Sequence, residues 1–241
     1  MGVSTTQAST TCASLPWYDF PATAGALDAV WRVVVMALKA AGIDYAPDSL
    51  DRVTPHRSQL QDPGLVLSQC CGPELFLKHT LQVVPIAAPV FSAYDVAPGY
   101  YFSHIVAGEG ATLEKPRVAV NDLASYSGHM AVKHWLAANV ADYSIHVTGS
   151  HAQSVRDIQA GDADVAAIDA LSWLYLDTDG VSILADSRPV LAPPFVTSCH
   201  NGIPNEVLAQ ALSVAFAQSG QPVGIADVLP VARDDYLAFC K

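Results

Sequence analysis

Two proline-rich segments interrupt this chain, one near residues 89–99 and one near residues 189–194. Proline fixes φ and lacks a backbone N–H, so each segment predicts a change of chain direction rather than regular structure. The block between them, residues 99–191, alternates short apolar runs with amphipathic runs. The flanking segments alternate in the same way, so the chain is predicted to be an α/β protein.

Two architectures fit this pattern. In the first, residues 1–98 and 192–241 together build one lobe and residues 99–191 build a second. Each lobe is then a mixed sheet flanked by helices, and the two proline-rich segments are crossovers that act as a hinge. In the second, all strands form a single doubly wound sheet with proline-rich loops. The pattern alone favours neither.

Hydrophobic periodicity predicts the elements themselves. Strands are expected at 13–18, 64–69, 81–87, 101–107, 117–121, 144–148, 164–168 and 195–199. Helices are expected at 23–41, 127–138, 151–159, 169–176 and 204–217. Gly42 is a plausible stop for the first helix. Pro85 places the strand 81–87 at a sheet edge or makes it end there.

Composition excludes several classes of protein. The formal net charge of −11 makes nucleic acid and anionic lipid poor partners. No run of about 18 apolar residues could span a membrane. The first 16 residues lack an apolar core, so no signal peptide is visible. The five scattered cysteines form no disulfide framework, and no CxxC pair suggests a zinc site. We expect a monomer without metal or cofactor.

The most informative turn follows the strand 117–121. We expect Ser127 to cap the next helix and leave the backbone N–H groups of Gly128 and His129 free. Such donors, with the helix dipole and the Ser125 hydroxyl, make a site for an anion. The alternative is an ordinary capped helix that binds no ligand.

Two further turns end apolar strands of the same block. Ser150 and Gln153 have capping-box spacing, which explains both structurally and leaves His151 as an added donor. Asp169 follows a buried strand, where α/β proteins bind ligands, although it could simply cap a helix. Together the three turns indicate one crevice.

Catalysis has weak support in the sequence. The motifs GxSxG, GxxxxGK[ST] and GxGxxG are absent, and His151 directly follows Ser150, which is not the arrangement of a nucleophile and its base. An enzyme could still use Cys70 or Cys71 with His151. A module that binds a peptide in the crevice is a third possibility.

Five segments carry a resemblance to a known family: LSQCCG (67–72), YFS (101–103), AVNDLASYSG (119–128), VTGSHAQSV (147–155) and GDADVAAIDALSW (161–173). In this order and spacing they resemble the PhnD-type phosphate/phosphite/phosphonate-binding proteins of ABC transporters. That resemblance implies the two-lobed type II periplasmic-binding-protein fold, and so favours the first architecture.

The resemblance also implies a function and a site. It implies a receptor, not an enzyme, that closes on a small oxyanion and delivers it to an ABC permease. The implied compartment is the periplasm; without a visible signal peptide, the cytoplasm is the alternative. An acidic Asp169 beside an anion implies a protonated oxyanion or an aminoalkylphosphonate. The implied ligand-binding residues are Tyr18, Ser68, Gln69, Cys70, Tyr101, Asn121, Ser125, Tyr126, Ser127, Gly128, His129, Ser150, His151 and Asp169.

Overall fold

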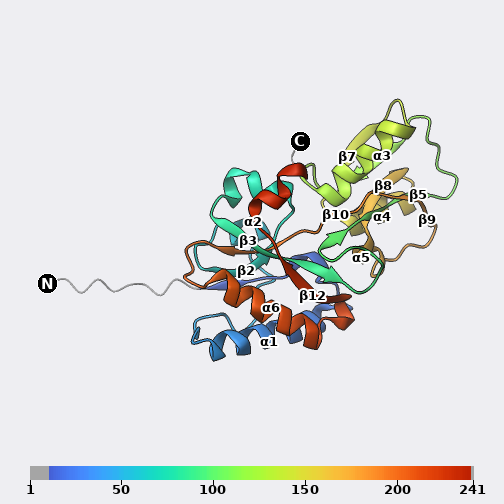
Figure 1. The fold of residues 1–241 in the computed structure, drawn as a ribbon. Helices are drawn as coiled ribbons and strands as arrows, with labels where there is room; N and C mark the ends of the chain where they lie inside the picture. Colours follow the sequence, from blue (N-terminus) through green and yellow to red (C-terminus); the bar gives the residue numbers. More distant parts are fainter. Residues whose placement is uncertain (1–10, 240–241) are drawn as a thin grey trace.

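The computed structural model describes residues 11–239. Its strands form two five-stranded sheets and one two-stranded sheet, and the two large sheets lie in separate halves of the molecule (Figure 1). The two-lobed α/β class is therefore confirmed, and the single doubly wound sheet is wrong. Among the described helices, none has the length and apolar character needed to cross a membrane. Ten of the 16 N-terminal residues on which the signal-peptide expectation rests, and Cys240, lie outside the described residues.

The first lobe is built on the sheet of order β1-β2-β11-β3-β12. Its strands are β1 (Cys12–Ala13), β2 (Leu65–Gln69), β3 (Val83–Phe91), β11 (Phe195–Ser198) and β12 (Ile225–Pro230). The long helices α1 (Ala24–Ala40) and α6 (Asn205–Ser219) pack side by side below it (Figure 1). The short helical elements of this lobe are η1 (Pro16–Tyr18), α2 (His56–Gln59), η2 (Pro73–Phe76), η3 (Lys78–Thr80), η5 (Gln221–Val223) and η6 (Arg233–Phe239).

Helix α1 forms where its periodicity predicts it. Leu27, Trp31 and Leu38 lie on one face and are buried in the core of the lobe. The helix ends at Ala40, two residues before Gly42, which has φ +82°, and the Ile43 N–H donates to the Leu38 carbonyl. Glycine adopts this left-handed conformation without strain, so the predicted stop is confirmed.

Strand β3 departs from the sequence prediction. It runs from Val83 to Phe91 and lies between β11 and β12, so it is neither an edge strand nor ended by Pro85. Pro85 pairs with Val196 beside a shift in register between Phe195 and Val196. A bulge of this kind accommodates a residue that has no N–H to donate to the ladder.

The second lobe is built on the sheet of order β7-β6-β8-β5-β9. Its strands are β5 (Ser103–Gly108), β6 (Arg117–Val120), β7 (Ser144–Val147), β8 (Val165–Asp169) and β9 (Val181–Asp186). Helix α3 (Ala131–Asn139) covers one face, where it packs on Val118 and Val120. Helix α4 (His151–Gln159) packs on the other face with Ala119. The alternation along β6 thus divides the helices between the two faces.

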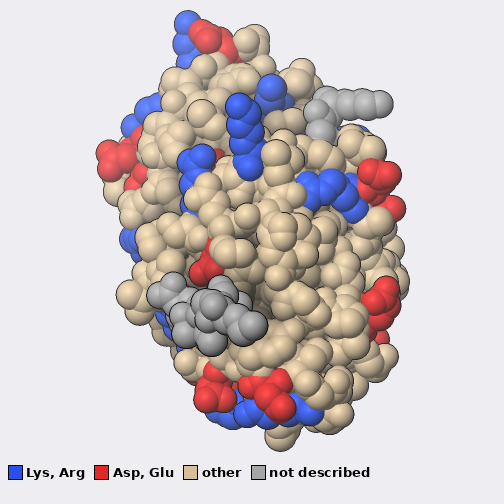
Figure 2. Space-filling model, turned by 90° about the vertical axis from the view of Figure 1, so that its left-hand side faces the viewer, with Lys and Arg blue, Asp and Glu red and all other residues tan. Residues whose placement is uncertain are grey.

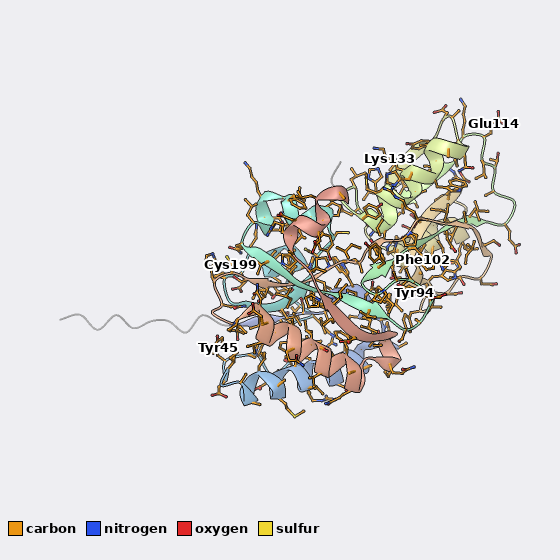
Figure 3. The ribbon with its side chains drawn as sticks, in the orientation of Figure 1. Tyr45, Tyr94, Phe102, Glu114, Lys133 and Cys199 are labelled. Atoms are coloured by element: carbon orange, nitrogen blue, oxygen red, sulfur yellow. The ribbon has the colours of Figure 1, made fainter. Side chains whose placement is uncertain are left out.

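Two crossovers join the lobes. One leads from β3 to β5 and the other from β9 to β11. Within them β4 (Tyr100–Tyr101) and β10 (Val190–Leu191) pair antiparallel, so the two crossovers are hydrogen-bonded side by side. The rings of Tyr94 and Phe102 meet edge to face on the first crossover, with centroids 5.1 Å apart (Figure 3). Such a paired double connection has the form of a hinge between two lobes.

Candidate functional site

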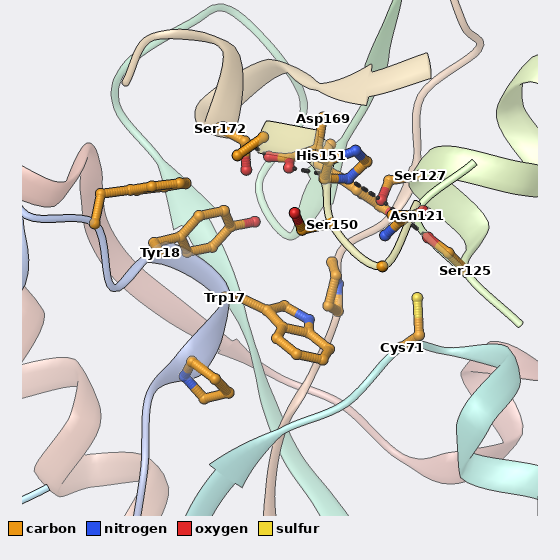
Figure 4. Close-up of a pocket in the computed structure, with 16 residues that line it drawn as sticks. Trp17, Tyr18, Cys71, Asn121, Ser125, Ser127, Ser150, His151, Asp169 and Ser172 are labelled. Carbon is orange, nitrogen blue, oxygen red and sulfur yellow. Dashed lines mark hydrogen bonds and ion pairs between the residues drawn. The ribbon is translucent and has the colours of Figure 1, made fainter. Parts of the chain in front are cut away.

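A cavity of about 320 Å³ lies between the lobes (Figure 4). It is lined by Pro16, Trp17, Tyr18, Phe20, Cys71, Tyr101, Asn121, Ser125, Ser127, Gly149, Ser150, His151, Ala152, Asp169, Ser172 and Pro193. Both lobes and both crossovers contribute. No Lys or Arg side chain of the described residues lines it. Any anion bound here is therefore held by neutral donors and helix starts.

The turn after β6 places two serines differently from the prediction. Ser125, not Ser127, is the N-cap: its hydroxyl accepts the Gly128 N–H at 3.1 Å at the start of the π-helical turn η4 (Tyr126–Met130). The predicted free N–H of Gly128 is therefore occupied. Ser127 does no capping, and its hydroxyl faces the cavity (Figure 4). A serine without a structural bond of this kind is available to a ligand.

Gly128 matters because of what it leaves room for. A Cβ built on it would lie 1.8 Å from the Asn121 Oδ1 atom. A side chain at residue 128 would therefore displace Asn121, which lines the cavity. Its Oδ1 atom is buried and has no hydrogen-bond partner among the described residues, so this amide is free to meet a ligand.

The start of α4 forms the second part of the polar wall. Ser150 caps the helix by accepting the Gln153 N–H at 3.1 Å, as predicted. The reciprocal half of the capping box is missing, because the Gln153 side chain donates to Asp157 instead. Gly149, Ser150, His151 and Ala152 all line the cavity, so the positive end of the α4 dipole is directed at it.

His151 lies in the cavity wall between two polar groups. Its Nε2 atom is 3.0 Å from the Ser127 Oγ atom and 3.5 Å from an Asp169 oxygen. Burial lowers the pKa of His151, and the Asp169 carboxylate partly opposes this. A catalytic relay needs the serine and the carboxylate on different ring nitrogens. Here both meet Nε2, so the arrangement suits ligand contact rather than activation of Ser127.

Asp169 is a buried carboxylate at the end of β8. Its Oδ1 atom accepts the Ser172 N–H at 2.9 Å and so caps α5 (Ala170–Trp173), which is shorter than the predicted helix 169–176. The pKa values of Tyr18 and Tyr101 are raised by burial and, further, by this carboxylate. Both phenols therefore stay protonated and act as donors in the cavity.

The first lobe contributes an apolar wall. The predicted strand 13–18 is wrong beyond Ala13, because Pro16 begins the short helix η1, which brings Trp17 and Tyr18 to the cavity. Cys71 lies opposite the serine turn, and its sulfur accepts the Tyr126 N–H at 3.4 Å across the cleft. Burial raises the pKa of the Cys71 thiol to about 11, so it is protonated at neutral pH.

Six predicted site residues do not line the cavity: Ser68, Gln69, Cys70, Tyr126, Gly128 and His129. They lie behind the wall or outside it. Ser68 bonds Ser14 in the core, 2.8 Å away, and Gln69 accepts the Trp17 N–H. Cys70 is wholly buried in the first lobe, so Cys71 takes the place expected for it. His129 bonds the Leu123 carbonyl from the surface.

The remaining eight predicted residues meet in the cavity: Tyr18, Tyr101, Asn121, Ser125, Ser127, Ser150, His151 and Asp169. Sequence analysis missed the aromatic residues Trp17 and Phe20 as site residues, because nothing in their pattern separates them from core aromatics. In residues 11–239, no three His, Cys, Asp or Glu side chains lie close enough to hold a metal ion. A two-lobed α/β fold with a polar interlobe cavity defines a solute-binding receptor.

The comparisons with known proteins agree. Residues 74–231 match the model of the family of periplasmic substrate-binding proteins of phosphonate ABC transporters, and the chain belongs to that family. The members of this family are substrate-binding components of transporters, and the family is not an enzyme family. Among the curated proteins, none matches.

Solved structures share the fold at low identity. XAC2383 from Xanthomonas citri bound to chloride is 13% identical, with TM-score 0.68 over 96% of each chain. PhnD1 from Prochlorococcus marinus with methylphosphonate is 12% identical, with TM-score 0.66 over 95% of this chain and 96% of that one. A phosphonate-transporter binding protein from Pseudomonas aeruginosa is 10% identical, with TM-score 0.64 over 95% of this chain and 83% of that one.

Proposed function

We propose that this receptor binds a small oxyanion of the phosphonate, phosphite or phosphate class and closes on it by a hinge motion. The observation that carries the proposal is the convergence of Ser125, Ser127 and Ser150 with the start of α4 on one cavity. These groups donate hydrogen bonds without adding charge, which reconciles an anionic ligand with a chain of net charge −11.

The residues of the ligand site are proposed to be the eight predicted ones that line the cavity, with Trp17, Phe20 and Cys71 added. The lobes are proposed to comprise residues 1–98 with 192–241 and residues 99–191. The PhnD1 relative, whose structure contains methylphosphonate, supports this ligand class.

Asp169 further restricts which oxyanions can bind. A buried carboxylate repels a fully ionised phosphonate, whereas it accepts a hydrogen bond from a P–OH group or an ammonium group. Because Asp169 lies beside His151 in the cavity, we propose a singly protonated oxyanion or an aminoalkylphosphonate as ligand.

Assembly and location follow the family. The family implies a small ligand and a membrane permease as partners, and its members are periplasmic. For this chain we propose an ABC permease as the partner, a periplasmic location and action as a monomer. Nucleic acid is not proposed as a partner, because the acidic charge repels phosphate backbones.

The test is a ligand screen on the purified chain. Phosphate, phosphite, methylphosphonate and 2-aminoethylphosphonate are compared by thermal shift and calorimetry. A ligand at about one hundred times its Kd adds about 2.7 kcal/mol of stability, so a true ligand raises Tm by several degrees. The bound ligand is then recovered after long incubation. A receptor returns it unchanged; absence of binding by all four compounds, or chemical conversion, contradicts the proposal.

A further inference from the structure

A second, larger cavity of about 670 Å³ adjoins the first. The two share Trp17, Cys71, Asn121, Ser125 and Gly149, so they form one continuous cleft between the lobes. We call the first the inner cavity and the second the outer cavity. The outer cavity is further lined by His56, Arg57, Glu74, Leu77, Lys78, His79, Asp122 and Ala124. A phosphonate held at Ser125 in the inner cavity would therefore lie next to the outer cavity.

The outer cavity carries the cations that the inner cavity lacks. Arg57 and Lys78 line it, both are exposed, and neither forms an ion pair or hydrogen bond with any described residue. The whole chain has 12 Lys and Arg against 23 Asp and Glu, so cations are outnumbered about two to one. Figure 2 shows basic side chains gathered on the upper part of one face. Two such cations at one cleft favour an anionic group between the lobes.

The acidic side chains of the outer cavity are already engaged. Glu74 meets the His79 Nε2 atom at 2.9 Å with one oxygen and accepts the Cys71 N–H with the other. Asp122 accepts the Ala124 N–H at 2.7 Å. Both carboxylates keep their negative charge, so the formal charges of Arg57, Lys78, Glu74 and Asp122 cancel. The donors of Arg57 and Lys78 have no partner among the described residues, so these two side chains are the groups of the outer cavity that can bind a carboxylate.

An aromatic pair lines the outer cavity, and one of its members, Trp17, also lines the inner cavity. The rings of Trp17 and His56 lie 4.9 Å apart, and the His56 Nε2 atom meets the Gln69 carbonyl at 2.7 Å. This pair gives an apolar surface along which a short methylene arm can lie. The cleft thus offers neutral donors in the inner cavity and two unpaired cations in the outer cavity, and Trp17 lines both.

We propose that the outer cavity binds a second anionic group of the ligand, so that the preferred ligand is a phosphonate bearing a carboxylate on a short alkyl arm. This inference rests on the proposed function, because it takes the phosphonate end to occupy the inner cavity. The carboxylate would bind Arg57 and Lys78. The inference restricts the preferred ligands from simple oxyanions to ω-carboxyalkylphosphonates.

The test compares matched ligand pairs by calorimetry at low ionic strength. Phosphonoacetate, 3-phosphonopropionate and 4-phosphonobutyrate are each compared with the corresponding amide, which keeps the shape and removes the second charge. Each exposed ion pair contributes up to about fivefold in affinity, so the best acid should exceed its amide about three- to tenfold. Arg57→Gln with Lys78→Gln should abolish this advantage and leave amide binding unchanged.

Lys133→Gln is the matched control. Lys133 is an exposed cation of the second lobe (Figure 3) and lines neither cavity, so its substitution removes one of the two charges lost in the double variant without touching the cleft. The acid advantage should survive in this variant. The inference is overturned if no acid exceeds its amide by more than about twofold, or if the advantage persists without Arg57 and Lys78. If neither acids nor amides bind while methylphosphonate or phosphate does, the inference fails and the proposed function stands; the proposed function fails only if those simple oxyanions do not bind either.

Discussion

The two walls of the interlobe cleft differ in kind. The second lobe presents hydroxyls, a helix start, an imidazole and a carboxylate, all at the carboxyl ends of strands in one sheet. The first lobe presents Pro16, Trp17, Tyr18, Phe20 and the thiol of Cys71. The polar wall can therefore recognise charge, whereas the apolar wall can exclude water and define shape. On the proposed function, the second lobe recognises the anion and the first lobe closes on it.

Substitution of Ser127 tests the polar wall most directly. A hydrogen bond to a charged group contributes about 1.5–3 kcal/mol. Ser127→Ala should therefore weaken binding of the best phosphonate about ten- to a hundredfold by calorimetry. The fold should remain intact, because the cap of η4 is Ser125 and not Ser127.

Ser154→Ala is the matched control for this loss. Ser154 is a buried serine of the same lobe that bonds Thr148 and does not line the cavity. It should lose stability but keep its affinity. Equal affinity of Ser127→Ala and the wild-type chain would show that the polar wall is not the anion site.

A substitution at Gly128 tests how the polar wall is built. In Gly128→Ala the added methyl group meets Asn121 at 1.8 Å, so one of the two must move. Overpacking of this kind costs about 1–3 kcal/mol, which urea unfolding would detect. Affinity should fall with stability because Asn121 lines the cavity. Gly149→Ala is a poor comparison, since Gly149 has φ +90°; Gly25→Ala, which meets no atom within 4 Å, is the proper control.

The sequence predicted the second lobe better than the first, for physical reasons. Its strands are short apolar runs bounded by polar turns, so β6, β8 and α4 lie close to their predicted positions. Strand β9 was missed because it is an edge strand, whose Ile183 and Leu184 are exposed and show no clear alternation. Strand β12 was missed for a related reason, since it also lies at the edge of its sheet.

The site was predictable where local rules act and not where tertiary contacts decide. The caps at Ser150 and Asp169 follow from local chemistry, and both residues line the cavity. The exchange of roles between Ser125 and Ser127 did not follow, because the π-helical turn η4 begins at Tyr126, before the predicted start of the helix. Likewise, which of Cys70 and Cys71 faces the cleft depends on the alternation of side chains at the end of β2.

Acidification should lower the free energy of unfolding through His151, by less than the substitutions above change binding or stability. Burial lowers the pKa of His151 below its usual 6.5, so the unfolded chain binds a proton more readily than the folded chain. The free energy of unfolding contributed by this group is then fully present above pH 6.5 and falls as the pH drops below it. Asp157 and Asp164 have lowered pKa values and act near or below pH 4, outside this window.

Urea unfolding between pH 5.5 and 7.5 measures this slope. His151→Gln should reduce the loss of stability on acidification, whereas His200→Gln, at an exposed turn, should not. His56 is also buried with a lowered pKa, so part of the slope should remain in His151→Gln. An unchanged slope in His151→Gln would mean that this imidazole is solvated in the free protein.

The smallest effect is expected where the apolar wall meets the second lobe. The rings of Phe20 and Tyr175 stack across the cleft with centroids 5.4 Å apart, and the Tyr175 hydroxyl donates to the Pro222 carbonyl of the first lobe. Tyr175 does not line the inner cavity, so Tyr175→Leu weakens closure without removing a ligand contact. Aromatic pairs contribute about 0.5–1.5 kcal/mol, which corresponds to about a two- to tenfold faster ligand dissociation. Stopped-flow kinetics should show this change in the off-rate, and small-angle scattering should show a larger mean radius with ligand.

Tyr45→Leu, at an exposed tyrosine of the first lobe far from the cleft, should show neither change. If Tyr175→Leu releases its ligand at the wild-type rate, the stacked pair does not hold the lobes together. The apolar wall would then act on ligand shape alone.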